Sequence, residues 1–129
     1  MRAALAQVIA GVLRDWPGLD GAAVFDAPPG RSAHPFVVVA EPVVLDLSAG
    51  LTIGREARVP VLIEDAGESP ARLRGLMAAA EEALAALPRV LPGGWRVTVN
   101  ALGRSRVAKA GGRWVATIEW RVRLWREDA

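Results

Sequence analysis

The feature that most constrains the fold of this chain is a regular alternation over residues 113–126. One set of positions is apolar and consists of Trp114, Ala116, Ile118, Trp120, Val122 and Leu124. The positions between them hold Arg113, Thr117, Glu119, Arg121 and Arg123, together with Val115 and Trp125. A period of two predicts a β-strand with one face against a core. A slip of one residue would turn the arginines into that core, so the register of the strand is firmly set.

A second alternating segment precedes this strand and predicts a terminal β-hairpin. Pro92-Gly93-Gly94 predicts a turn, after which Trp95, Val97 and Val99 share one face of a strand. The glycine-bounded segment 103–112 then predicts a long polar loop. The basic side chains expected on this loop are Arg104, Arg106 and Lys109.

Two segments have the apolar spacing of amphipathic helices. Residues 2–14 place Leu5, Ile9 and Leu13 on one stripe, and Pro17 and Gly18 stop the pattern. The second helix, rich in alanine, is expected to start at Ser69 and Pro70 and to end at Pro88. Its buried stripe is predicted to contain Leu73, Leu76, Met77, Ala80, Leu84 and Leu87.

Three strand segments are expected between the helices. A short strand spans residues 22–26, and an apolar run of β-branched residues over 36–45 is interrupted at Pro42. A further strand spans 55–64, where Pro60 indicates incomplete pairing. The polar, glycine-bearing segment 46–54 predicts a long hairpin loop, and we expect Asp46 and Arg55 at its ends to face partners.

The element order predicts one α+β domain over residues 1–129: a largely antiparallel sheet with two helices packed on one face and a long hairpin loop. A length of 129 residues is that of a single domain. There are no cysteines, which excludes disulfides and thiolate metal sites. No span long enough to cross a bilayer is evident, so we expect a soluble protein with no membrane partner.

The high isoelectric point of about 10.3 is weak evidence for nucleic-acid binding. The formal charge is only +2, and 15 of the 16 basic residues are arginines, which do not titrate below a pH of about 12. The late basic residues could still meet phosphates, so a nucleic-acid-binding module that uses the C-terminal arginines remains an alternative. The other interpretation is a solvated face with acidic partners such as Glu119 and Glu127.

The sequence offers little for catalysis, and we expect neither an enzyme nor a cofactor. His34 is the only histidine, and no nucleophile motif or phosphate-binding loop accompanies it. Glu64, Asp65 and Glu68 precede the second helix, where they suit its positive dipole end. A magnesium site at these acids is the alternative interpretation.

Some apolar side chains lack an obvious cover within the chain. Phe36 and Val38 belong to a run that is apolar on both faces, and Val115 and Trp125 lie on the otherwise polar face of the last strand. Exposed apolar patches usually mark interfaces, so these four residues are the candidate subunit interface. The alternative is that the first helix or the long loop folds over them.

The order of these segments resembles the tail-terminator (tail-completion) proteins of long-tailed phages, prophages and gene transfer agents. The matching segments are Val24-Phe25-Asp26-Ala27-Pro28, His34-Pro35-Phe36-Val37-Val38-Val39, the strand 58–64, the alanine-rich helix and the terminal hairpin with alternating aromatics and arginines. The resemblance covers nearly the whole chain.

The resemblance implies a non-catalytic ring, usually of six copies, at the head-proximal end of a tail. Its partners would be other copies of itself, the tail tube protein and the head-side connector or stopper protein. DNA would pass through the lumen without sequence-specific binding. The protein would assemble in the cytoplasm and end at the head–tail junction of a phage-like particle. Another neck protein, such as the stopper, is the alternative within this class.

Overall fold

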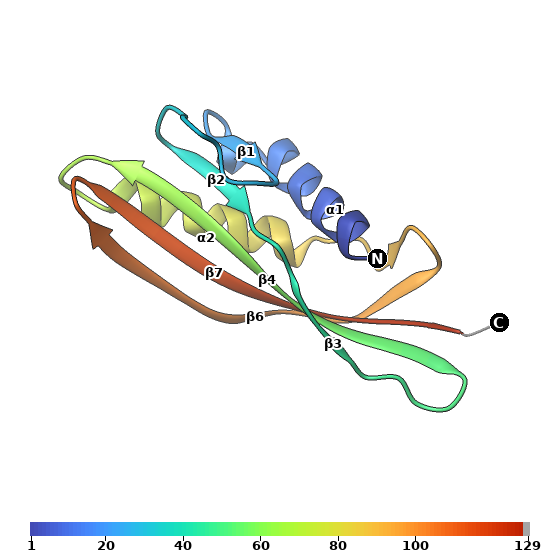
Figure 1. Ribbon diagram of the computed structural model, residues 1–129. Helices are drawn as coiled ribbons and strands as arrows, with labels where there is room; N and C mark the ends of the chain where they lie inside the picture. Colours follow the sequence, from blue (N-terminus) through green and yellow to red (C-terminus); the bar gives the residue numbers. More distant parts are fainter. Residues whose placement is uncertain (128–129) are drawn as a thin grey trace.

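The computed structural model describes residues 1–127 and confirms the predicted α+β fold, with two helices over one face of a seven-stranded sheet (Figure 1). In chain order the elements are α1 (Arg2–Asp15), the 3-10 helix η1 (Pro17–Leu19), β1 (Ala23–Phe25), β2 (Phe36–Val39), β3 (Val43–Asp46), β4 (Thr52–Ala66), α2 (Ala71–Ala85), β5 (Val90–Leu91), β6 (Trp95–Ala110) and β7 (Arg113–Glu127). The strand order is β1-β2-β4-β7-β6-β5, with β3 also paired to β4.

The long strands β4 and β7 form the centre of the sheet. They pair antiparallel from Thr52 opposite Glu127 to Ala66 opposite Arg113. The predicted faces of β7 are confirmed, because its apolar set is buried from Ala116 to Leu124 and partly buried at Trp114, while the arginine set lies on the other side. Because this pairing is uninterrupted, alternate residues of β4 and β7 form one continuous face along the whole length of both strands.

Pro42 and Pro60, the two prolines expected to disturb the sheet, lie at the same position along one edge of β4. β2 pairs with β4 at residues 61–64 and β3 pairs with it at 55–58, so both strands follow the same edge of β4. Pro42 separates β2 from β3, and Pro60, which has no N–H to donate, lies opposite this break and accepts a hydrogen bond from the Ala40 amide at 2.9 Å. The expected gap in pairing is thus confirmed. All other strand pairs are antiparallel except β1 with β2.

The predicted loop over residues 103–112 is wrong. β6 continues through it to Ala110, and only Gly111 and Gly112 form the turn. Gly103 does not end the strand, because β7 offers a full-length partner and the irregularity is absorbed as a β-bulge between Leu102 and Arg104. A second register shift lies between Val97 and Val99.

The predicted loop 46–54 is also shorter than expected. β3 reaches Asp46 and β4 begins at Thr52, so that the connection is residues 47–51. The β3–β4 hairpin projects beyond the helices at the end of the sheet opposite β1 and β2 (Figure 1).

The core lies between the sheet and the helices. Leu5, Ile9 and Leu13 of α1 and Leu73 and Leu84 of α2 are fully buried against it, as the helical spacing predicts. Neither helix of the described residues is long and apolar enough to cross a membrane.

Polar anchors fix the helix α2 at both of its ends. Asp65, at the end of β4, is buried and accepts hydrogen bonds from the Arg72 guanidinium, which lowers the pKa of the Asp65 carboxyl despite its burial. At the other end, the Asn100 side chain donates to the Leu84 carbonyl at 2.9 Å and accepts from the indole N–H of Trp120. Both anchors join the helix to the sheet that it covers.

Candidate interaction surface

The sheet face without helices, here named the open face, carries most of the candidate functional residues. Residues paired across antiparallel strands share a face, so the register assigns its members. Its charged side chains are Arg58, Arg96, Arg104, Arg106, Arg113, Arg121, Arg123, Glu56, Glu64, Glu119 and Glu127. Seven arginines against four glutamates give the open face a formal charge of +3, whereas the whole chain carries +2. Counted from the sequence, the remainder of the chain therefore has a formal charge of −1.

The centre of the open face is an arginine cluster around Glu56. Arg123 Nε donates to Glu56 Oε1 at 3.0 Å, and Arg58 donates to Oε2 through Nε at 3.2 Å and Nη2 at 3.1 Å. Arg121 Nε lies 3.9 Å from Oε1. Glu56 is only 4% exposed, because the guanidinium groups cover it. Three arginines around one carboxylate leave this cluster with a net charge of +2.

Electrostatics favour the ionised form of Glu56. The hydrogen bond from Arg123 holds the pKa of the Glu56 carboxyl below its ordinary value of 4.5, and Arg58 acts in the same direction, while burial opposes them. The side chains of the three arginines remain nearly half exposed. Their outward N–H groups can therefore receive anionic groups of a partner.

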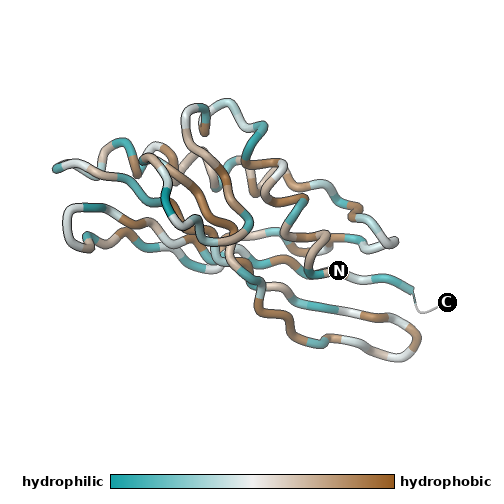
Figure 2. Tube along the Cα trace, turned by 45° about the horizontal axis from the view of Figure 1, so that its top comes forward, coloured by the Kyte–Doolittle hydropathy of each residue, from teal (hydrophilic) through white to brown (hydrophobic). Residues whose placement is uncertain are grey.

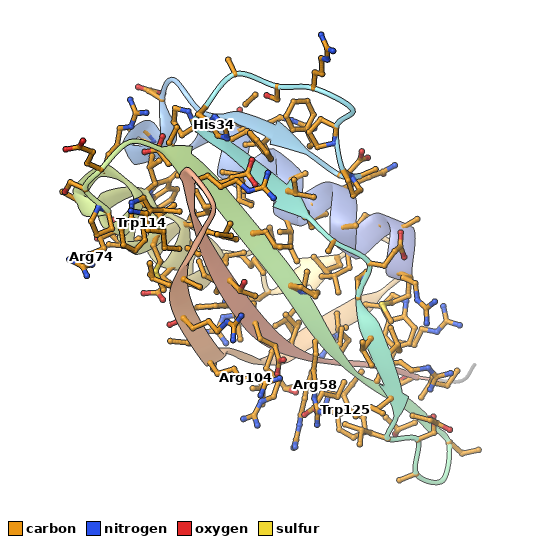
Figure 3. All side chains as sticks on the ribbon, turned by 60° about the vertical axis from the view of Figure 1, so that its left-hand side comes forward. His34, Arg58, Arg74, Arg104, Trp114 and Trp125 are labelled. Carbon is orange, nitrogen blue, oxygen red and sulfur yellow. The ribbon has the colours of Figure 1, made fainter. Side chains whose placement is uncertain are left out.

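Figure 3 shows Arg104, Arg58 and Trp125 along the same side of the sheet. Arg104 forms an ion pair with Glu119 across the strands, at 3.3 Å. The Arg104 side chain stays largely exposed, and so do the adjacent residues 103–106 of β6. Arg104 and Arg106 thus face outward, from a strand and not from the expected loop. Lys109 lies on the other face, where its ammonium group is 5.4 Å from the centre of the Trp114 ring.

At the β1–β2 end, the open face contains an apolar hollow of about 450 Å³. Its floor is sheet and its wall is the loop after β1; the lining residues are Pro28, Pro29, Gly30, Arg31, Ser32, Phe36, Val38, Ala40, Leu62, Glu64, Arg113 and Val115. Three of the four candidate interface residues, Phe36, Val38 and Val115, meet here. The β1–β2 loop covers Val38, while Phe36 and Val115 remain partly exposed.

The rim of the hollow is polar. Glu64 accepts a hydrogen bond from His34 Nε2 at 2.8 Å, with the imidazole acting as the donor, and lies 3.2 Å from Arg113 Nε. The His34 ring also stacks on Phe36 with 5.5 Å between ring centroids. His34 therefore holds the wall of the hollow, in keeping with the structural role expected for a loop histidine.

The fourth candidate, Trp125, lies at the far end of the open face. It is directly opposite Gly54, and the indole packs flat onto this glycine while its N–H donates to Thr98 Oγ1 at 2.8 Å. Val115 and Trp125 are ten residues apart on β7, or about 33 Å along a strand. The four residues thus form two patches at opposite ends of one face.

The β3–β4 hairpin adds apolar surface next to Trp125. Val43 and Leu45 on β3 are 56% and 39% exposed, and Leu51 at the tip is 81% exposed. In Figure 2 the hairpin is hydrophobic along β3 and at its tip. Asp46, at the base of the tip, accepts hydrogen bonds from Ser48 N at 2.9 Å and Arg55 Nη1 at 2.7 Å. Hydrogen bonds from Ser48 lower the pKa of the Asp46 carboxyl, which stays ionised and outward-facing.

The acids before α2 do not form a cation site. Glu64 and Asp65 are consecutive on β4 and point to opposite faces of the sheet, and Asp65 is held by Arg72. Within residues 1–127, no group of three metal-ligating side chains is arranged to hold an ion. The magnesium interpretation therefore has no geometric support.

Three residues of the candidate interaction surface are absent from the sequence-based candidates. Glu56 is an ordinary polar position of the predicted strand, and only the cross-strand register reveals its three arginines. Leu51 is one of three large apolar residues in the segment 46–54, with Leu47 and Ile53, and Leu62 shares a face with Pro60. The alternation within 55–64 could have placed Glu56 and Leu62 on the open face, but the sequence carries no signal for their neighbours.

Comparison with known proteins finds similar solved structures but no similar sequence family. No family model matches the chain, and no curated protein has a significantly similar sequence. Among solved structures, the chain is similar to a chain of a structure titled "Virion of native gene transfer agent (GTA) particle". The TM-score is 0.83 at 25% identity, and the match covers 96% of both chains.

Proposed function

We propose that this chain is a structural protein of a phage-like particle and acts there as the tail terminator. The observation that carries the proposal is the similarity to a chain of a gene transfer agent virion over 96% of both chains. The resemblance seen in the sequence leads to the same class of particle and narrows the role to the terminator. In this role the protein is not an enzyme: it ends tail-tube polymerisation and presents a docking surface to the head-side connector.

The proposed assembly is a closed ring, with six copies as the expected number. A ring needs heterologous contacts, in which one patch meets a different patch on the next copy. The separation of Phe36, Val38 and Val115 from Trp125 supports this, because it provides two different apolar patches. DNA passes through the lumen, and we place the arginines of the open face toward protein partners, since a strongly basic lumen would slow the DNA.

Electron microscopy of particles from a strain lacking this gene tests the proposal. Loss of a terminator gives overlong tails that also lack heads, and a plasmid copy of the gene restores their length. Tails of normal length that fail to join heads would instead indicate the stopper role. Intact particles with tails of normal length would contradict both roles.

The charge of +3 on the open face supports a second candidate, a nucleic-acid-binding module. Phosphate contacts would make the affinity fall steeply with salt. A gel-shift assay with short duplex DNA at low salt tests this candidate, with Arg121→Ser/Arg123→Ser as the variant expected to lose the shift. Absence of a shift with the wild-type protein would exclude the nucleic-acid-binding function.

A further inference from the structure

We propose that the β3–β4 hairpin tip of one copy inserts into the apolar hollow of a second copy of this chain. The proposal rests on the ring of the proposed function and names the contact that builds it. The tip is residues 47–51, with Leu51 as its most exposed apolar side chain. The receptor is the hollow floored by Phe36, Leu62 and Val115.

The two surfaces match in polarity. The tip contains no charged residue, so it can enter an apolar hollow without desolvating a charge. Leu51 is 81% exposed on its own chain, and burial of such a side chain is favourable. The hollow is open on the side away from the sheet and presents partly exposed Phe36 and Val115.

The charges around the two surfaces are complementary. Asp46, at the base of the tip, is 71% exposed, and its Oδ2 makes no hydrogen bond within the described residues. The rim of the hollow carries Arg31 and Arg113, both exposed, and Arg31 forms no ion pair within residues 1–127. A tip seated in the hollow would bring an acidic group toward a basic rim.

Placement in the fold makes the contact intermolecular. Leu51 directly precedes β4, and the hollow lies beside Glu64 near the other end of the same strand. A strand of this length separates them by about 40 Å. The tip therefore cannot reach the hollow of its own chain. A contact between opposite ends repeats from copy to copy, and it closes into a ring when the rotation per step divides a full turn and adds no translation along the axis.

Mixing two variants tests this contact by sedimentation velocity at tens of micromolar. Leu51→Ser removes the tip side chain and Val115→Arg fills the hollow, and each is expected to weaken self-association by about tenfold or more. A mixture retains one intact tip and one intact hollow. It should form heterodimers and nothing larger. Leu102→Ser, which changes a 44% exposed leucine on the helix side of the sheet, away from the tip and the hollow, is the matched control and should assemble as the wild type does. Unchanged assembly of both single variants would overturn the proposal.

Cross-linking gives a second measurement that does not depend on the stability of Val115→Arg. Because the chain has no cysteine, Leu51→Cys/Val115→Cys introduces the only two thiols. Oxidation of purified particles or concentrated protein should give a ladder of covalent multimers on a non-reducing gel, whereas Leu51→Cys alone should not. Absence of the ladder in both samples would overturn the contact. Tail length in the deletion strain tests the terminator role separately, so the two proposals can fail independently.

Discussion

Replacement of Gly54 by alanine tests the packing of Trp125 at the hairpin end of the open face. A methyl group built on Gly54 would lie 2.6 Å from Cε3 of the indole, so the ring must move away. Movement of the ring also breaks the hydrogen bond to Thr98 Oγ1. Overpacking of this kind costs about 1–3 kcal/mol, against which alanine gains about 0.5–1 kcal/mol over glycine in a strand.

We therefore expect Gly54→Ala to lower the free energy of unfolding by about 1–2 kcal/mol. Urea unfolding followed by far-ultraviolet circular dichroism measures this change. Gly75→Ala in α2 is the matched control, because a methyl group there meets no atom within 4 Å. This control should stabilise the protein by about 1 kcal/mol.

A double-mutant cycle identifies the indole as the cause. In a Trp125→Ala background the steric conflict is gone, and Gly54→Ala should stabilise the strand by about 0.5–1 kcal/mol. The sign of the effect of one substitution thus depends on a residue far away in sequence. An equal effect of Gly54→Ala in both backgrounds would refute the packing described here.

Three further predictions concern the polar anchors and the arginine cluster. Hydrogen bonds from Arg72 lower the pKa of the Asp65 carboxyl below 3.8. The stability that ionised Asp65 contributes is therefore present above pH 3.8 and is lost as the pH falls through the folded-state pKa. At pH 7, Asp65→Asn should have a lower free energy of unfolding than the wild type, and this difference should close below about pH 4 in acid titrations. Asn100→Leu leaves the buried Trp120 indole N–H without its acceptor and should lower the free energy of unfolding, measured in urea, by about 2–3 kcal/mol. An unchanged free energy of unfolding would contradict this hydrogen bond. Glu56→Gln removes the charge that balances three arginines and should cost about 1–2 kcal/mol at low salt, with a smaller loss in 1 M NaCl; equal losses at both salt concentrations would contradict the electrostatic reasoning.

The elements predicted most accurately from the sequence are those with a strong local pattern. The alternation on β7 sets the face of every side chain, since only one register keeps the arginines out of the core. The helical stripes on α1 and α2 are equally clear. Gly103 shows the limit of local signals, because a strand continues past a glycine when its neighbour supplies hydrogen bonds along its full length.

The candidate surface was less predictable because it is made by contacts between distant segments. The cluster around Glu56 joins β4 to β7, whose residues 56 and 123 are far apart in the chain. The hollow depends on the path of the loop 26–35, which folds over the open face at one end. An alternating pattern assigns each side chain to a face, but it encodes neither the residue that lies opposite on the next strand nor the path of a loop.

The outer edge of β6 has a consequence for how copies can meet. β5 covers only the first residues of this strand, and within residues 1–127 no strand pairs with its outer side beyond Val97. Such a long free edge would invite other chains to extend the sheet into open-ended fibrils. Two bulges and the basic side chains of Arg104, Arg106 and Lys109 oppose such pairing by breaking its flatness and by charge repulsion. The segment that the sequence pattern predicts to be a loop is thus a bulged and basic edge strand that disfavours aggregation.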